Sequence, residues 1–190
     1  MSDTNLRVKS NSLFLNILFQ YIVVILVLTF SLSIFYYQMI KKDYLSNLKD
    51  ELRNNLLIVT DLIIDDYLNE NYNLLNGKIS SLGKKINKRL TVIRMDGTVI
   101  SDSEEDYTKM ENHSERPEII AAYNGNLGES IRFSNTLKLN MLYIAMPIMD
   151  RDNIIGVLRI SYWLKDIKDI IRIYQLELII EIKLFYKTLC

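Results

Sequence analysis

Five polar side chains, spread over four segments, are of the types that bind anions. They are His113, Arg116, Arg132, Tyr143 and Arg159. Guanidinium and imidazole groups donate hydrogen bonds to carboxylates and phosphates, and a tyrosine ring supplies an aromatic wall for a pocket. The last three lie on separate predicted strands, so they share a pocket only if the strands turn them to one face of a sheet. Ordinary exposed positions for these three, and local capping of a loop by His113 and Arg116, are the alternatives.

An acidic segment precedes His113. It contains Asp102, Glu104, Glu105 and Asp106. A calcium-binding loop of the EF-hand type would need a glycine near position 107 and a more distal bidentate glutamate, but the sequence has Tyr107 and His113 at those places. We therefore expect a solvated acidic loop and no metal site. An extracellular hydrolase that uses Asp102 or Glu104 is a further alternative, although no spacing of carboxylates argues for it.

The scarcity of histidine and cysteine restricts the chemistry further. His113 is the only histidine and Cys190 the only cysteine among 190 residues, so metal sites, disulfides and Ser-His-Asp triads are not expected. The sequence also lacks the glycine-rich phosphate-binding motifs and the zinc-helix motif. Its 23 basic and 23 acidic residues balance to a formal net charge of zero, which disfavours nucleic acid as a partner. We predict no catalytic residues and no cofactor.

Residues 12–40 predict a transmembrane helix that would hold these side chains at a membrane. No charged residue occurs between Lys9 and Lys41, and about 20 apolar residues suffice to cross a bilayer as a helix. A cleaved signal peptide is the alternative, but the apolar stretch is longer than a usual signal-peptide core. The flanking charges do not decide the orientation. A cytoplasmic tail at residues 1–11, with the larger part of the chain outside, is the simpler topology.

A heptad stripe follows the apolar stretch without an intervening glycine or proline. It consists of Leu45, Leu48, Leu52, Val59 and Leu62, with Asn55 interrupting one position. This spacing predicts one helix that continues from the membrane to about Leu75. The stripe either pairs with a second copy in a dimer or packs on the helix's own domain, and the two interpretations can apply to different stretches. A short second helix is expected around residues 84–88, after breaks at Asn76-Gly77 and residues 80–83.

Residues 41–163 are expected to form a domain of the α+β class. Strands are predicted at residues 90–95, 98–100, 129–135, 140–149 and 154–163. Asp96-Gly97 predicts a type I′ turn between the first two strands, and Pro117 predicts the start of a short helix. Strands joined by hairpins favour an antiparallel sheet over a nucleotide-binding βαβ fold. Residues 164–190 have a helical period but too many charges for a membrane span.

Four blocks of this domain resemble the extracytoplasmic sensor of PhoR-type histidine kinases. They are residues 89–103 (RLTVIRMDGTVISDS), 110–119 (MENHSERPEI), 130–137 (SIRFSNTL) and 141–148 (MLYIAMPI). The second block is the most specific, and the resemblance covers about Leu13 to Ile170. It implies a PAS-like single Cache domain between two transmembrane helices, followed inside the cell by a HAMP linker and the kinase domains.

The resemblance implies that the chain is the input portion of a two-component sensor. Such a portion would detect a stimulus outside the cell and transmit it as a shift in the packing of dimer helices. The chain stops before a second membrane helix and a kinase domain, so we expect a gene truncated near Ile170 or a fragment, without kinase activity. The input domain of a chemoreceptor or cyclase is one alternative. A membrane-tethered binding protein, acting alone or with a full-length sensor kinase, is another. The expected partners are the bilayer, a second copy and a small anionic ligand.

Overall fold

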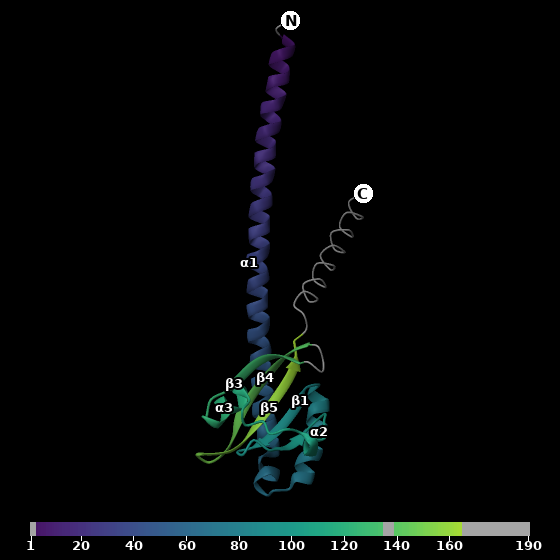
Figure 1. The fold of residues 1–190 in the computed structure, drawn as a ribbon, viewed down its shortest axis with the longest axis vertical. Coiled ribbons are helices and arrows are strands. Elements are labelled where there is room, and N and C mark those ends of the chain that lie inside the picture. The colour runs from purple at the N-terminus through teal and green to yellow at the C-terminus, as the bar shows by residue number, and fades with distance from the viewer. Residues whose placement is uncertain (1–2, 135–138, 165–190) are drawn as a thin grey trace. The chain divides into compact units, whose positions relative to one another are not determined.

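The computed structural model describes residues 3–134 and 139–164 (Figure 1). Its helices are α1 (Asp3–Leu68), α2 (Tyr72–Ile86), the 3₁₀ helix η1 (Tyr107–Lys109) and α3 (Pro117–Tyr123). Its strands are β1 (Arg89–Arg94), β2 (Val99–Asp102), β3 (Gly128–Ser134), β4 (Leu139–Asp150) and β5 (Asn153–Trp163). The chain divides into two compact units, Met1–Asn47 and Leu48–Cys190. The C-terminal helix predicted for residues 164–190 lies, apart from Leu164, outside the described residues.

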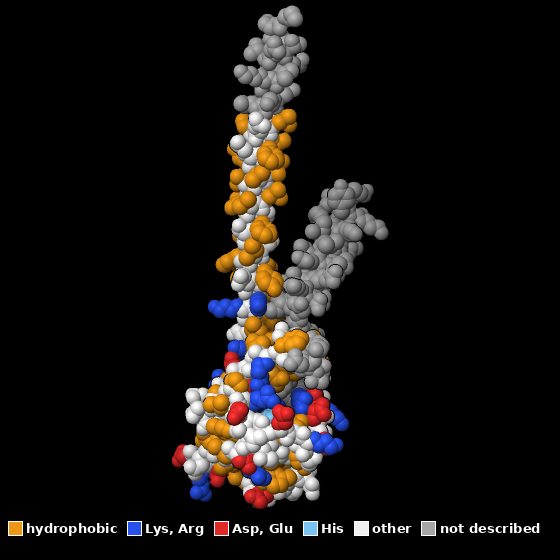
Figure 2. Space-filling view, viewed as in Figure 1, with side chains coloured by type: hydrophobic (Ala, Val, Ile, Leu, Met, Phe, Trp, Pro, Cys, Tyr) orange, Lys and Arg blue, Asp and Glu red, His pale blue; other side chains and the backbone are white. Residues whose placement is uncertain are grey.

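In the first unit, residues 14–39 of α1 carry apolar side chains around the whole helix. Between Phe14 and Met39 its large apolar side chains are exposed, and Figure 2 shows them around the helix. The hydroxyl of Thr29 donates to the carbonyls three and four residues earlier (3.0 Å each), and that of Ser31 to the carbonyl four residues earlier (2.9 Å). Polar groups satisfied within their own helix suit a lipid environment. By length and composition, this helix can cross a membrane.

In the second unit, α1 ends at Leu68, earlier than the end predicted near Leu75. Glu70 takes a left-handed backbone conformation (φ 52°), which ends the helical path. The side chain of Asn71 then accepts a hydrogen bond from the backbone N–H of Leu74 (3.4 Å) and caps α2. The prediction of one uninterrupted helix to Leu75 is therefore wrong, because an asparagine cap begins a new helix instead.

Helix α2 also contains the residues that predicted a break. Asn76-Gly77 and Gly83 lie inside it rather than at its ends. Asn76 Oδ1 accepts a hydrogen bond from Ser101 Oγ (2.9 Å). A Cβ atom at Gly83 would lie 2.5 Å from Cβ of Ser103. Asn76 and Gly83 thus serve the contact between α2 and the β2 segment, and the second helix is longer than the one predicted around residues 84–88.

The five strands form one antiparallel sheet in the order β2-β1-β5-β4-β3. The predicted α+β class and antiparallel sheet are confirmed. The hairpin at Asp96-Gly97 is also confirmed, but its predicted turn type is wrong. A type I′ turn needs positive φ at both residues, and only Gly97 has it (φ 84°). Gly97 N–H donates to the carbonyl of Arg94 (2.9 Å), which makes a longer loop that ends on a left-handed glycine.

Helices α1 and α2 cover one face of the sheet (Figure 1). Their side chains in this core are Leu48, Leu52, Leu56, Val59 and Ile63 of α1 and Leu75 and Ile79 of α2, all buried. Two polar contacts also join α1 to the sheet. The Tyr67 hydroxyl donates to the carbonyl of Ile155 (2.7 Å), and Lys49 forms an ion pair with Glu129 of β3.

This burial divides the predicted dimer stripe. Leu48, Leu52 and Val59 lie in the core of their own domain, which agrees with the other interpretation of the stripe, and we propose no dimer contact for these three. A side chain that is fully covered within one chain has no surface left for a second copy. Asn55 is partly buried and Leu62 is 50% exposed, and these two remain open to a partner. Leu45 belongs to the first unit and is partly exposed.

The other face of the sheet is covered by α3 and the loop that precedes it. A small apolar cluster there contains Ile93, Val99, Ile119, Ala122, Ala145 and Val157. Side chains alternate along a strand, so residues 91 and 89 of β1 and 159 and 161 of β5 continue the same face. These positions are Thr91, Arg89, Arg159 and Ser161, and the face therefore changes from apolar to polar along the strands.

Candidate anion-binding cavity

A cavity of about 190 Å³ opens on this polar part of the sheet. Its lining consists of Arg89, His113, Arg116, Arg132, Met141, Tyr143, Arg159 and Ser161. The cavity thus brings together all five residues predicted from the sequence. Its other three lining residues, Arg89, Met141 and Ser161, were not predicted. Figure 2 shows basic side chains gathered on this side of the domain, with acidic ones beside them. Their role as ligand contacts stays a prediction.

The register of the sheet explains why these positions meet. Arg159 stands in the central strand β5, between Thr91 of β1 and Ala145 of β4. One pair further along the same face, Tyr143 lies opposite Ser161. The guanidinium of Arg132 lies 4.4 Å from the ring centroid of Tyr143, and that of Arg159 lies 5.3 Å from it. Both arginines are therefore packed on one aromatic ring, which limits their rotation.

The loop before α3 brings His113 to the cavity by backbone hydrogen bonds. His113 N–H donates to the carbonyl of Gly97 (2.8 Å), and the Asn112 side chain donates to the carbonyl of Asp96 (2.7 Å). A Cβ atom at Gly97 would lie 2.6 Å from the backbone nitrogen of Ser114, so this approach requires a glycine. The hairpin turn and the histidine loop are thus one structural unit, which fixes the imidazole over the sheet.

A buried carboxylate that was not among the predicted residues organises the arginines. Glu118 lies in the first turn of α3 and is fully buried. Its Oε1 accepts a hydrogen bond from Arg132 Nη2 (2.6 Å) and lies 3.6 Å from Arg159 Nη1. Pro117 indicated the start of this helix, but it did not indicate that the next residue faces the sheet.

A second buried carboxylate, Asp102, is saturated with donors. It accepts hydrogen bonds from Arg89 Nε (3.1 Å to each oxygen) and Thr91 Oγ1 (2.8 Å). The backbone N–H groups of Glu104 and Glu105 add two more (3.0 Å each). The expected solvated acidic loop is therefore confirmed for residues 104–106, which are exposed, but not for Asp102, which is 5% exposed. Among the described residues, no cluster of histidine, cysteine or acidic side chains could hold a metal ion.

The cavity carries a surplus of positive charge and spare hydrogen-bonding atoms. Four arginines line it, and three carboxylates pair with them, the buried Asp102 and Glu118 and the exposed Glu111 (4.0 Å from Arg116), which leaves 4 − 3 = 1 positive charge. Four buried side-chain atoms around it have no hydrogen-bond partner: His113 Nδ1, Glu118 Oε2, Arg159 Nε and Ser161 Oγ. An unpaired buried polar atom is costly, so these atoms favour a polar ligand.

Burial and neighbouring charges set the protonation states. Burial, with the nearby Arg159 and Arg116 guanidinium groups, lowers the pKa of His113 to about 4. Burial also lowers the pKa of Arg159 to about 10, although the Glu118 carboxylate opposes this shift. At neutral pH the imidazole is therefore uncharged and the arginine is charged. Arg159 donates to Thr91 Oγ1 (3.2 Å), which joins the two carboxylate clusters.

We predict that His113 makes the domain less stable in acid. Its folded-state pKa of about 4 lies below the unfolded value of 6.5. The unfolded chain therefore binds more protons between these pH values, and the free energy of unfolding falls as the pH falls through this window, by up to about 3 kcal/mol. Urea unfolding of the full chain in detergent, followed by the fluorescence of the only tryptophan, Trp163, measures this loss. The H113Q variant should lose less stability over the same window; an equal loss would contradict the prediction.

We also predict that Gly128→Ala loosens α3 from the sheet. A Cβ atom at Gly128 would lie 2.6 Å from the carbonyl carbon of Glu118 and 2.8 Å from its Cα. These are backbone atoms, so the helix must move, at a cost of about 1–3 kcal/mol in unfolding free energy. The control is Gly77→Ala in α2, where a new Cβ has nothing within 4 Å. That change should stabilise the protein slightly, because alanine favours helix. The same urea titration tests both.

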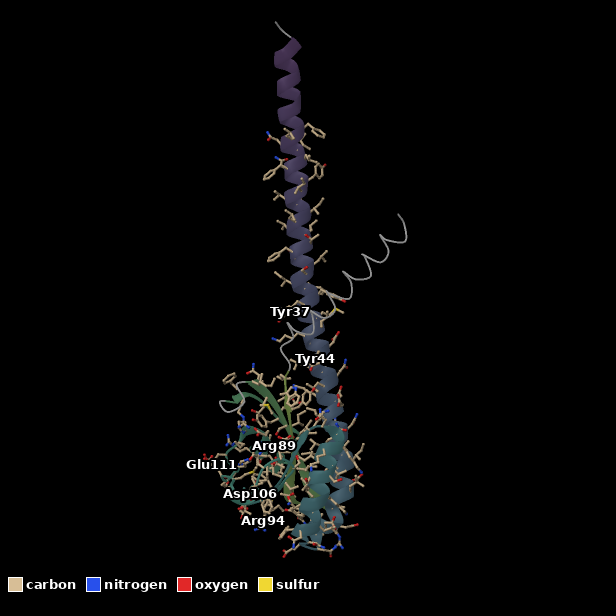
Figure 3. All side chains as sticks on the ribbon, turned by 90° about the vertical axis from the view of Figure 1, so that its right-hand side faces the viewer. Tyr37, Tyr44, Arg89, Arg94, Asp106 and Glu111 are labelled. Atoms are coloured by element: carbon tan, nitrogen blue, oxygen red, sulfur yellow. The ribbon has the colours of Figure 1, made fainter. Side chains whose placement is uncertain are left out.

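A larger cavity lies toward the opposite end of β1. Figure 3 labels Arg89 and Arg94, the two ends of that strand. The second cavity, of about 520 Å³, is lined by Arg94, Tyr72, Val99, Ile100, Tyr107 and Met110 with three polar residues. Its arginine already contacts Tyr72, with Nη2 3.2 Å from the hydroxyl. None of the unpartnered buried atoms found in the described residues belongs to its lining. The smaller cavity is therefore the better candidate for a ligand.

A family model described as Single Cache-like matches residues 42–162, more than half of the 190 residues. No curated protein matches the chain.

Three solved structures illustrate the likeness in fold. A domain of a sensory box/GGDEF family protein from Vibrio parahaemolyticus has a TM-score of 0.52 at 17% identity, covering 66% of this chain and 57% of that one. The sensor domain of the V. cholerae histidine kinase DctB has a TM-score of 0.45 at 17% identity (56% and 42% covered). The ligand-binding domain of the Campylobacter jejuni chemoreceptor Tlp3, in complex with 4-methylisoleucine, has a TM-score of 0.41 at 14% identity (58% and 56% covered). The aligned region spans about half the length of these chains.

Proposed function

Because the chain belongs to the Single Cache-like family, we propose that it is the membrane-anchored, extracytoplasmic sensor portion of a two-component histidine kinase of the PhoR type. In this proposal the domain binds a small anionic ligand and has no enzymatic activity of its own. The observation that carries it is the cavity on the polar face of the sheet. There, four arginines converge, and only three carboxylates pair with them, one of which is the exposed Glu111 at 4.0 Å from Arg116.

The cavity limits the size and charge of the ligand. Its volume of about 190 Å³ equals that of about six water molecules at 30 Å³ each, which suits a ligand of few non-hydrogen atoms. Arg159 Nε and Ser161 Oγ are buried and unpartnered, and both can donate a hydrogen bond. A carboxylate or a similar oxyanion would accept from both groups and would also be attracted by the surplus charge.

Titration of the full chain in lipid nanodiscs tests this role. Acetate, lactate, succinate, phosphate and sulfate are the probes, at constant ionic strength, with chloride as the reference anion. We expect at least one oxyanion to bind with saturation and to raise the midpoint of thermal unfolding, because it binds only the folded domain. If none of the five binds more tightly than chloride, the ligand-binding part of the proposal fails.

Membrane anchoring rests on the apolar part of α1. We propose that residues 1–11 lie in the cytoplasm, that residues 12–40 cross the membrane and that residues 41–163 lie outside. The test is labelling of whole cells with a membrane-impermeant maleimide, using a Lys109→Cys chain in which Cys190 is replaced by serine. The Lys109 side chain is 82% exposed, so it is open to the reagent. Labelling only after the cells are lysed would contradict this topology.

For the dimer, we propose a face on α1 that contains Asn55, Ile58 and Leu62. Ile58 is 60% and Leu62 50% exposed, and they are four residues apart on one side of the helix. We predict that single cysteines at Ile58 or Leu62, in a Cys190→Ser chain in membranes, form disulfide-linked dimers. A cysteine at the exposed Arg53, which lies on another side of the helix, is the control. Equal cross-linking at all three positions would contradict a specific seam.

A further inference from the structure

Glu118 is a buried anion directly behind the proposed ligand site. It does not line the cavity, but both of its arginine partners, Arg132 and Arg159, do. Its Oε1 lies 2.6 Å from Arg132 Nη2 and 3.6 Å from Arg159 Nη1, while Oε2 has no partner. One carboxylate thus stands against two guanidinium groups, which leaves this inner cluster with 2 − 1 = 1 positive charge.

The position of this carboxylate is fixed by the backbone. The first turn of α3 packs so closely on Gly128 that a Cβ there would meet backbone atoms of Glu118. The side chain is fully buried, so water does not screen its charge as it would at the surface. An anion in the cavity therefore meets the Glu118 carboxylate behind the two arginines.

We propose that the Glu118 carboxylate, by partly neutralising Arg132 and Arg159, restricts the cavity to ligands with a singly charged anionic group. This inference rests on the proposed ligand-binding function and adds its charge specificity. A singly charged group matches the one positive charge that the inner cluster leaves. A doubly charged group would meet one uncompensated repulsion in a poorly screened environment, which lowers its affinity on the order of tenfold or more.

Replacement by the isosteric amide tests the proposal. The full chain in nanodiscs is titrated at pH 7.5 with sulfate, a dianion, and acetate, a monoanion, at one ionic strength. We expect E118Q to raise the ratio of sulfate affinity to acetate affinity by about tenfold. The control is E129Q. It also removes a carboxylate that pairs with a cation, Lys49, but it lies on the α1 side of the sheet. Its ratio should stay within about twofold of the original, because exposed charges are screened.

A second variant should change the ratio of sulfate affinity to acetate affinity in the opposite direction. R132M removes one guanidinium and leaves Glu118 to neutralise Arg159, so the sulfate-to-acetate ratio should fall by about tenfold. If E118Q does not fold, which a missing cooperative unfolding transition would show, the R132M variant still tests the proposal.

Three outcomes would overturn the inference. An unchanged ratio in E118Q, with binding by the original chain intact, removes the charge role but leaves the proposed function standing. Loss of both anions in E118Q means that Glu118 positions the arginines instead of selecting charge. Absence of binding by the original chain and by every variant overturns the proposed function, and the charge selection with it.

Discussion

Replacing Arg159 by methionine is expected to lower the affinity for small oxyanions about a hundredfold. Arg159 is 5% exposed, and its Nε is the only unpartnered buried guanidinium nitrogen among the described residues. A hydrogen bond to a charged group contributes about 1.5–3 kcal/mol, and the lost charge adds to that loss. Methionine keeps much of the apolar length of the side chain. Titration of the R159M chain in nanodiscs with the best-binding oxyanion measures the effect.

Two other arginines provide the comparison. Arg94 lines the larger cavity at the far end of β1, so R94M should leave anion affinity unchanged. Arg116 lines the anion cavity, but its side chain is 41% exposed and its ion pair with Glu111 is long (4.0 Å), so R116M should cost only several-fold. If R159M bound the oxyanion as tightly as the original chain, the cavity would not be the binding site.

The fold was largely predictable because local patterns and tertiary packing agree over most of the domain. The β3, β4 and β5 runs and the Pro117 helix follow from periodicity and from residues with strong local preferences. Prediction failed where a residue with a turn preference is used for packing. Gly83 predicted a helix end, yet it lies inside α2 because Ser103 approaches too closely for any larger residue. Such a requirement depends on a distant segment, so no local pattern reveals it.

The candidate site was predictable in its residue types but not in its geometry. Three of its members stand on strands, and whether they share a face depends on the register, which alternation alone does not fix. One clue was present in β5, where Val157, Arg159 and Ser161 alternate with Leu158 and Ile160. An arginine between apolar residues on a central strand indicates a buried charge, and a buried charge requires a partner. That partner, Glu118, lies on a helix elsewhere in the sequence, so only the fold identifies it.

Two leucines of the predicted dimer stripe differ sharply in burial, although both belong to α1. Leu52 is fully buried in the domain core, whereas Leu62 is 50% exposed. We expect Leu52→Ala to lower the free energy of unfolding by about 2–5 kcal/mol, because it leaves a cavity in a packed core. Leu62→Ala should change it by less than about 0.5 kcal/mol, which is typical of a surface position. Urea unfolding of the full chain in detergent, followed by Trp163 fluorescence, compares the two.

Dimer formation should respond in the opposite way. Leu62→Ala removes an apolar side chain from the proposed seam, so it should reduce disulfide cross-linking through a cysteine at Ile58 without unfolding the domain. Leu52→Ala should leave that cross-linking unchanged under conditions in which the domain stays folded, since its side chain faces the sheet rather than a partner. If Leu52→Ala abolished cross-linking while the free energy of unfolding stayed the same, the seam would run through the buried stripe. The helix would then have to leave its own domain to form the dimer.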